Sequence, residues 1–409
     1  MLHRFVRLTV IPIVALVLVK SFSRGEDIPD PITRIECDTD FAFRLYRTLA
    51  EDRKHFVLSP FSVSAALGMV SGGAEGRTLE ELRAVRGSDM EDAKYHAAFA
   101  TLRKSMQAVK YDDRVTLAMD NALFLQDGRE IQPAFQTLLE TTYGCQLFRV
   151  DFEHQPLHTL NQLNQFVRVG TNGRGAPIQD TEIPIQTLLV LANTFYFKAS
   201  WESPFGRADT TLRPFYPEPN RGIQVHTMYQ KHTFPVAADE EAIILGLPYK
   251  HSRFIMYIVL PRPGRTLEEI EKGLDAKKWT AWRESTVKHE LELYLPRFAF
   301  ASRYELSPAI ATMGAPSAFN RDQADFGGIS ELKPLAIDLL IHSVGVEVDE
   351  SGTVAHAHTE VGGGFGEPEP LPLPSIVNVD RPFLFIITDL RHRSILFMGR
   401  VQNPAPAGP

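Results

Sequence analysis

The longest segment of the chain without a plausible core face lies near its end, at residues 346–383. It begins with a strand-like alternation at Val346 and Val348, and the alternation breaks at Ser351 and Gly352. Small residues, three consecutive glycines and a proline-rich tail follow, and continuous apolar sequence returns only at residues 383–387. A segment of this length between two apolar strands is usually functional or disordered. The fold must therefore accommodate a long exposed loop between two buried strands.

The composition allows one large globular domain. The chain has 409 residues, of which 44% are hydrophobic and 23% are charged, enough for one large core or two ordinary ones. No internal repeat or low-complexity linker divides the sequence, so residues 26–409 are predicted to form a single domain. The net charge of −7 and the pI near 6.0 give no reason to expect nucleic acid as a partner.

The N-terminal residues 1–25 have the pattern of a secretory signal peptide. Arg4 and Arg7 precede an apolar run at residues 8–19, and small residues follow at 21–23. The run is too short for an ordinary membrane span, although a signal anchor is the alternative. The C-terminus carries no retention signal of the Lys-Asp-Glu-Leu type. We therefore expect a secreted, extracellular protein without a membrane partner.

Two cysteines, Cys37 and Cys145, remain after removal of the predicted signal. In an oxidising compartment they could form one disulfide, but their spacing alone cannot establish the bridge. No asparagine is followed two residues later by serine or threonine, so N-glycosylation is not expected.

Capping residues and apolar periodicity predict a mixture of helices and strands. Strands are expected at residues 115–126, 145–152 and 186–197, and the last is almost continuously apolar, which is typical of a central strand buried on both faces. Helices are expected where apolar residues recur behind a capping residue or a proline: residues 38–49, a helix begun by Ser59 and Pro60, residues 79–85 capped by Thr78 and Glu81, residues 91–112, residues 157–169, and residues 304–313.

The sequence gives little support for an enzyme or a metalloprotein. It contains no nucleophile elbow, no His-Glu-x-x-His motif, no Cys-x-x-Cys pair and no phosphate-binding loop. Order alone cannot exclude a spatial Ser-His-Asp triad, but no spacing indicates one. His356 and His358, with Glu360, would share one face of an extended segment. Two solvent-facing histidines are favoured over a zinc site, because stable zinc sites use three or four ligands. We expect no cofactor and no metal.

Several phrases resemble the signatures of the serpin family of serine protease inhibitors. Its two C-terminal signatures are similar to GVEVDESGT at residues 345–353 and to DRPFLFIITDL with ILFMGRVQNP at residues 380–404. KASWESPF at residues 198–205 resembles an internal motif in which Ala199 replaces the usual glycine. The resemblance covers residues 38–404. It implies an α+β fold with three β-sheets, about eight or nine helices and an exposed, mobile reactive-centre loop at about residues 350–379.

The resemblance also implies a mechanism that the loop sequence can support. In serpins, a protease cuts the loop, and the freed segment inserts as a new strand in the main sheet while the protease is still acylated. Alternate residues of such a strand face opposite sides of the sheet, and one face here is wholly small and uncharged, whereas Val354, His356, His358 and Glu360 fall on the other. The resemblance assigns the hinge to these residues: Glu350, Gly352, Thr353, Ala355, Ala357 and Thr359.

A further group of residues matches the place where serpins open the main sheet. Ser59, Ser62, Asn193 and His342 correspond to the polar cluster beneath the opening, and such side chains can satisfy one another by hydrogen bonds. Trp201 corresponds to the aromatic residue at the top of the sheet, near the loop.

The loop sequence indicates which protease is the target. No lysine or arginine occurs in residues 345–379, which disfavours a trypsin-like enzyme, because its specificity pocket holds a carboxylate. Phe365 and Gly366 form the preferred scissile bond. Leu371 and Pro372 are the second choice, since the loop is longer than usual and a following proline resists most serine proteases. The predicted function is irreversible, covalent inhibition of a chymotrypsin-like serine protease; the alternative is a non-inhibitory serpin acting as a carrier or chaperone.

Glycosaminoglycan is not expected as a partner. The predicted helix at residues 91–112 carries Arg103, Lys104 and Lys110 with acidic residues beside them, which is typical of a solvated helix face. We expect a monomer.

Overall fold

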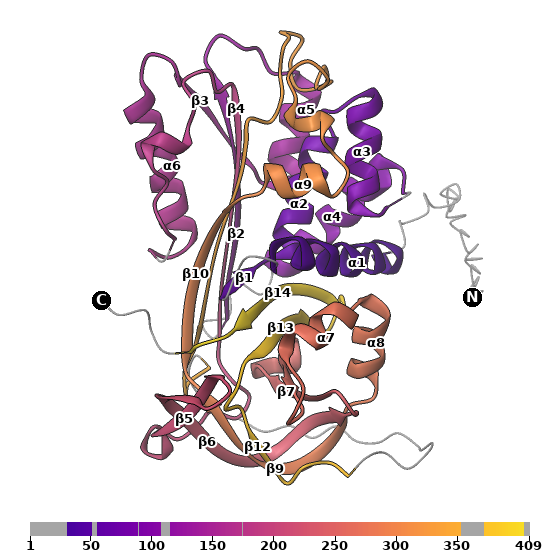
Figure 1. The fold of residues 1–409 in the computed structure, drawn as a ribbon. Helices are drawn as coiled ribbons and strands as arrows, with labels where there is room; N and C mark the ends of the chain where they lie inside the picture. The colour runs from indigo at the N-terminus through magenta and orange to yellow at the C-terminus, as the bar shows by residue number, and fades with distance from the viewer. Residues whose placement is uncertain are drawn as a thin grey trace, which may run out of the picture.

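The computed structural model describes residues 31–50, 55–88, 90–107, 115–173, 175–352 and 372–404, with side chains from residue 38 onward. Two hydrogen-bonded sheets and a cluster of helices make up this part of the chain (Figure 1). Most strand pairs in both sheets are antiparallel, and the helices pack against the sheets, which confirms the α+β class.

A five-stranded sheet runs through the upper half of the molecule as Figure 1 shows it. Helix α6 (Pro156–Gly170) covers one face, and a group of helices that includes α2 (Pro60–Ser71) covers the other. Both faces of the central strands are therefore buried, as the apolar run at residues 186–197 predicts. The strand order is β10 (Phe298–Glu305), β11 (Leu339–Val348), β4 (Leu189–Ala199), β2 (Val115–Gln126) and β3 (Gln146–Val150).

The second sheet has nine strands and occupies the lower half of Figure 1. The long strand β6 (Arg221–Ala238) pairs with three strands in succession: with β5 at its start, with β9 over its middle, and with β7 at its end. Two of the three sheets that the resemblance implies are therefore joined through β6. The other strands are β1 (Phe56–Leu58), β14 (Ser394–Val401), β13 (Phe383–Asp389), β8 (Phe254–Pro261), β7 (Ala242–Pro248), β9 (Val287–Pro296), β12 (Ile376–Asn378) and β5 (Thr211–Glu218).

The helices pack mainly behind the five-stranded sheet and beside the nine-stranded one. Helix α2 begins as expected: Ser59 caps it by accepting a hydrogen bond from the Ser62 amide, and Pro60 occupies the first turn, where no amide donor is needed. Every residue of α2 is buried. The remaining α-helices are α1 (Pro31–Ala50), α3 (Gly76–Arg86), α4 (Asp92–Gln107), α5 (Pro133–Leu138), α7 (Leu267–Gly273), α8 (Ala276–Glu284) and α9 (Ser307–Thr312).

Five short helical segments complete the described structure. A π-helical turn extends α5, and the other four are single 3₁₀ turns within connections. They are η2 (Leu139–Tyr143), η3 (Asp180–Glu182), η4 (Arg207–Asp209), η5 (Lys250–Ser252) and η6 (Ser317–Phe319).

Three of the predicted helix starts are wrong. Helix α1 begins at Pro31, seven residues before the predicted start at residue 38. The other two differ because of tertiary contacts. Helix α3 begins at Gly76, not after Thr78, and the Thr78 hydroxyl instead accepts a hydrogen bond from the Asp325 amide at 3.0 Å. The predicted helix at residues 304–313 begins only at Ser307, because Tyr304 and Glu305 still pair with β11. In both places a contact with a distant part of the chain replaces the local signal.

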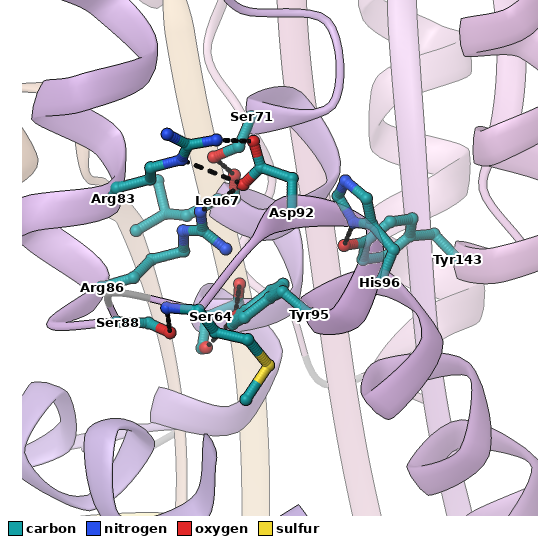
Figure 2. Close-up of polar contacts among 11 residues, drawn as sticks. Ser64, Leu67, Ser71, Arg83, Arg86, Ser88, Asp92, Tyr95, His96 and Tyr143 are labelled. Carbon is teal, nitrogen blue, oxygen red and sulfur yellow. Dashed lines mark hydrogen bonds and ion pairs between the residues drawn. The ribbon is translucent and has the colours of Figure 1, made fainter. Parts of the chain in front are cut away.

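Polar side chains tie helices α2, α3 and α4 together (Figure 2). The Asp92 carboxylate of α4 pairs with the Arg83 and Arg86 guanidinium groups of α3, and Arg86 also lies over the Tyr95 ring at 4.0 Å. Tyr95 and Ser64 share a hydrogen bond between their hydroxyls at 3.1 Å. These contacts join the three helices that cover one face of the five-stranded sheet.

Candidate functional site

The two central strands of the five-stranded sheet, β4 and β11, form a parallel ladder that we call the seam. It runs from Leu339 paired with Val190 to Gly345 paired with Tyr196. Each strand then continues for three residues that pair with no residue of the other. The seam is therefore closed along most of its length, and its C-terminal end is free of β4–β11 pairing. This end adjoins residues 349–352, which follow β11 and lead toward the loop.

Four of the predicted polar residues meet behind the seam. Asn193 of β4 and His342 of β11 are direct neighbours in the ladder, and their side chains face helix α2. The Asn193 Oδ1 atom accepts from the Ser62 hydroxyl at 2.6 Å and lies 2.8 Å from His342 Nδ1. The Ser59 amide donates to His342 Nε2 at 3.1 Å. The cluster thus links both strands of the seam to the start of α2.

Sequence reasoning missed one member of this cluster. The Asn193 amide group donates to Asn121 Oδ1 at 2.8 Å, which adds strand β2 to the network. Asn121 is buried and directly precedes the apolar run at residues 122–125 of β2. An amide side chain beside such a run was the available signal, because a buried polar group needs partners.

His342 is held neutral by its surroundings. Burial lowers its pKa from 6.5 to about 3. Since Nε2 accepts from an amide, the ring proton is on Nδ1, where it can be donated to Asn193. A second proton on Nε2 would face the Ser59 amide donor. Protonation would therefore disrupt the link between the seam and α2.

The opposite face of the seam carries two unsatisfied hydroxyl groups. Thr194 and Ser343 are direct neighbours in the ladder and are fully buried. Within the described residues, neither hydroxyl has a hydrogen-bond partner. A Cβ atom placed on Gly170, at the end of α6, would lie 2.0 Å from the Thr194 hydroxyl oxygen, so α6 packs directly on this face. Unpaired buried hydroxyls destabilise the closed seam locally.

Glu350 of the predicted hinge is fixed in place at the C-terminal end of the seam. Its carboxylate forms an ion pair with Arg297 and accepts from the Thr210 hydroxyl at 2.5 Å. Its carbonyl oxygen accepts from the Phe205 amide at 2.9 Å. Burial opposes ionisation of the carboxyl, but the hydrogen bonds from Thr210 and Arg297 outweigh it and hold the Glu350 pKa below its usual range. Neither Thr210 nor Arg297 carries a sequence signal that could have identified it.

Trp201 lies at the hinge, away from the polar cluster behind the seam. Its indole nitrogen donates to the Asp349 carbonyl at 3.0 Å, and its amide donates to the Ser351 carbonyl at 3.2 Å. Gly352 follows with a φ of +65°, and a Cβ there would lie 2.1 Å from the Trp201 amide nitrogen. Only glycine meets both conditions without rearrangement.

The remaining predicted loop residues lie outside the described part of the chain. These are Thr353, Ala355, Ala357 and Thr359 of the hinge, the preferred scissile pair Phe365 and Gly366, and Leu371 of the second choice. Pro372 is described and precedes strand β12. The hinge alternation and the scissile bond therefore stay predictions.

The disulfide between Cys37 and Cys145 stays a prediction. Cys145 is buried, and burial raises the pKa of its thiol to about 12. The side chain of Cys37 lies outside the described residues.

The described residues contain neither a metal-binding cluster nor a membrane-spanning helix. No group of three or more metal-ligating side chains gathers within them. None of the helices in the described residues is long and apolar enough to cross a membrane.

Helix α4 carries the cations considered for glycosaminoglycan binding. The Arg103 guanidinium donates to the Thr141 carbonyl at 2.9 Å, so it binds the protein's own backbone. Lys110 is not described.

Comparison with known proteins identifies the family. The family model described as "Serpin (serine protease inhibitor)" matches residues 36–404. Plasma serine protease inhibitor of Bos taurus is 32% identical over 388 residues, covering 93% of this chain and 93% of that protein. Alpha-1-antichymotrypsin of Homo sapiens is 32% identical over 382 residues, covering 90% of this chain and 88% of that protein.

A solved structure agrees with the sequence comparisons. Human thyroxine-binding globulin complexed with thyroxine superposes with a TM-score of 0.81 at 28% identity, covering 92% of this chain and 99% of that one. The family match, the relatives and the arrangement of sheets and helices agree, and the chain belongs to the serpin family of serine protease inhibitors.

Proposed function

We propose that the protein is a secreted inhibitor of a serine protease with chymotrypsin-like specificity. It acts once, by trapping the acylated protease covalently while the cleaved loop inserts between β4 and β11. The observation that carries this proposal is the seam: its ladder stops at Gly345 and Tyr196, just before the hinge, and the remaining residues of the two strands are unpaired with each other. A loop that continues from β11 can begin to insert there.

The loop sequence favours insertion energetically. The inserted strand would place small residues at Thr353, Ala355, Ala357 and Thr359 on its buried face. Insertion creates on the order of ten backbone hydrogen bonds, each contributing roughly 1 kcal/mol. A charge on the buried face would offset several of them, and the sequence places none there.

The specificity argument rests on the absence of cations in residues 345–379 and on Phe365 as the preferred residue before the cut. A hydrophobic specificity pocket accepts phenylalanine, whereas a pocket with a carboxylate requires a cation. The relative named alpha-1-antichymotrypsin supports the same assignment. The proposed role requires no catalytic residue, cofactor or metal of the protein's own, and we propose that a monomer exported after cleavage near residue 25 carries it out.

The test is formation of a covalent complex. The purified protein is mixed with chymotrypsin, with trypsin, and with chymotrypsin whose catalytic serine is replaced by alanine. We expect an SDS-resistant adduct with active chymotrypsin alone. N-terminal sequencing of the released fragment should give GEPEPLPLP, which begins at Gly366. A fragment that begins at Pro372 would instead assign the cut to the second choice, and complete cleavage without any adduct would contradict inhibition.

The alternative is a non-inhibitory serpin that carries a small ligand. The likeness to thyroxine-binding globulin, a serpin whose structure holds thyroxine, favours it. Thermal unfolding before and after loop cleavage separates the two functions. An inhibitor should melt at a much higher temperature once the cleaved loop becomes a strand. An unchanged transition after clean cleavage would favour the carrier.

A further inference from the structure

A hollow of about 600 Å³ opens beside the hinge. Residues of strands β5 and β6, the start of β10 and the end of β11 line it, together with Arg207 of η4, Pro404, and Asp349 and Glu350 of the hinge segment. The hollow therefore adjoins both members of the ion pair between Glu350 and Arg297. Its volume suits a small organic molecule, since ligand pockets typically measure about 300–1,000 Å³.

Part of the lining of the hollow is apolar. Leu212 on β5 lines the hollow, and its side chain is 60% exposed. Val225 and Phe298, which are buried core residues, contribute further apolar surface, as do Ala299 and Val348. An exposed leucine at the rim of an apolar hollow is well placed to contact the apolar body of a ligand.

The charges around the hollow favour a cation. Three carboxylates line it, from Glu347, Asp349 and Glu350, against the two guanidinium groups of Arg207 and Arg297. Arg297 already pairs with Glu350. The Asp349 carboxylate accepts only an amide hydrogen bond, from Ser351 at 2.9 Å, and makes no ion pair within the described residues. Burial, together with the neighbouring Glu347 and Glu350 carboxylates, raises the Asp349 pKa above its usual range. A positive charge beside Asp349 would relieve this repulsion.

We propose that this hollow binds a small organic cation: an amine on an aromatic or aliphatic body, with the ammonium group beside Asp349 and the apolar body against Leu212, Val225 and Phe298. Asp349 supplies charge recognition, and the apolar strip supplies contact area. The proposal concerns binding alone and stands whether the protein proves to be an inhibitor or a carrier.

The charge preference is tested with three probes that share one aromatic body. They are 2-(1-naphthyl)ethylamine, 3-(1-naphthyl)propionate and 2-(1-naphthyl)ethanol, titrated into the intact protein at pH 7.5 by isothermal calorimetry. We expect the amine to bind at least about fivefold more tightly than the alcohol, the size of one charge-assisted hydrogen bond. The carboxylate should bind most weakly. Tighter binding of the carboxylate would overturn the proposal and indicate that Arg207 and Arg297 set the charge preference.

Two variants locate the site. Asp349→Asn keeps the acceptor for the Ser351 amide and removes the charge, so it should abolish the preference for the amine while leaving the alcohol unchanged. Leu212→Ser should weaken all three probes alike. The matched controls are Glu240→Gln, another acidic residue, and Leu157→Ser, which changes a leucine of α6 that is 67% exposed; neither residue lines the hollow.

The outcome is decided on variants whose melting temperatures match that of the unaltered protein. If Asp349→Asn does not fold, Leu212→Ser and the probe series remain, since Leu212 is already largely exposed. Amine binding that neither substitution changes would place the ligand elsewhere and refute the assignment. Because no protease is present in these titrations, failure here leaves the inhibitory function untouched, and absence of a protease adduct leaves the binding proposal untouched.

Discussion

The buried His342 should make the stability of the seam depend on pH in a predictable direction. Its pKa is lowered to about 3 in the folded protein by burial, whereas an unfolded chain restores a value of about 6.5. Below pH 6.5 the unfolded state therefore binds a proton that the folded state does not. Stability from this residue is fully present above about pH 7 and falls as the pH drops toward the folded pKa.

The size of the effect follows from the two pKa values. Each pH unit between them costs about 1.4 kcal/mol, so lowering the pH from 7.5 to 5.0 should remove about 2 kcal/mol. For a chain of this length that corresponds to a decrease in melting temperature of roughly 3 °C. The loss reflects the closed environment made by Ser59, Asn193 and the Tyr304 ring, which stacks on the imidazole at a centroid distance of 6.1 Å.

The assay compares the pH dependence of the unaltered protein with that of His342→Gln by differential scanning calorimetry. Glutamine retains hydrogen-bonding groups but does not titrate. Other groups titrate equally in both proteins, so the difference between the two pH profiles isolates His342. We expect the variant to start less stable and to lose about 2 kcal/mol less between pH 7.5 and 5.0. Parallel profiles would refute the reasoning, because His342 would then have the same proton affinity in both states.

Three further predictions concern the hinge and the loop. Glu350→Gln removes the ion pair with the half-exposed Arg297 and should lower the free energy of unfolding by about 1 kcal/mol in urea titrations; an unchanged midpoint would show that the pair contributes nothing. Thr353→Arg places a charge on the predicted buried face, so it should turn the inhibitor into a substrate on SDS gels without changing the melting temperature of the intact protein, and full retention of inhibition would disprove the alternation. Phe365→Arg should transfer adduct formation from chymotrypsin to trypsin, whereas unaltered specificity would exclude Phe365 from the scissile bond.

The local sequence signals were accurate where they coincided with tertiary packing. Strand β2 occupies Val115–Gln126, as its apolar pattern predicts, and α2 begins after Ser59 and Pro60. Strand β4 begins at Leu189, three residues later than predicted. The Asp338 carboxylate accepts from the Leu188 and Leu189 amides at 2.7 and 3.1 Å and marks this start. A carboxylate about 150 residues away leaves no trace in a local pattern.

The same limit applies to the candidate site. The resemblance identified Ser59, Ser62, Asn193 and His342, and the structure brings them together. It could not identify the partners of Glu350, because Thr210 and Arg297 come from separate segments that only the folded chain brings to the hinge. The sequence could not predict the hollow beside Asp349 either, since residues from separate parts of the chain line it.

The directions of the strands on either side of the seam bear on whether a further strand can pair there. Strands β4 and β11 run parallel through seven register pairs, whereas each runs antiparallel to its other neighbour, β2 or β10. A segment that left the C-terminal end of β11 and turned back between them would be antiparallel to both. It would replace one parallel ladder with two antiparallel ladders, a pairing that is slightly more stable per residue. Backbone pairing alone, without any contribution from side chains, thus favours a six-stranded sheet over the five-stranded one.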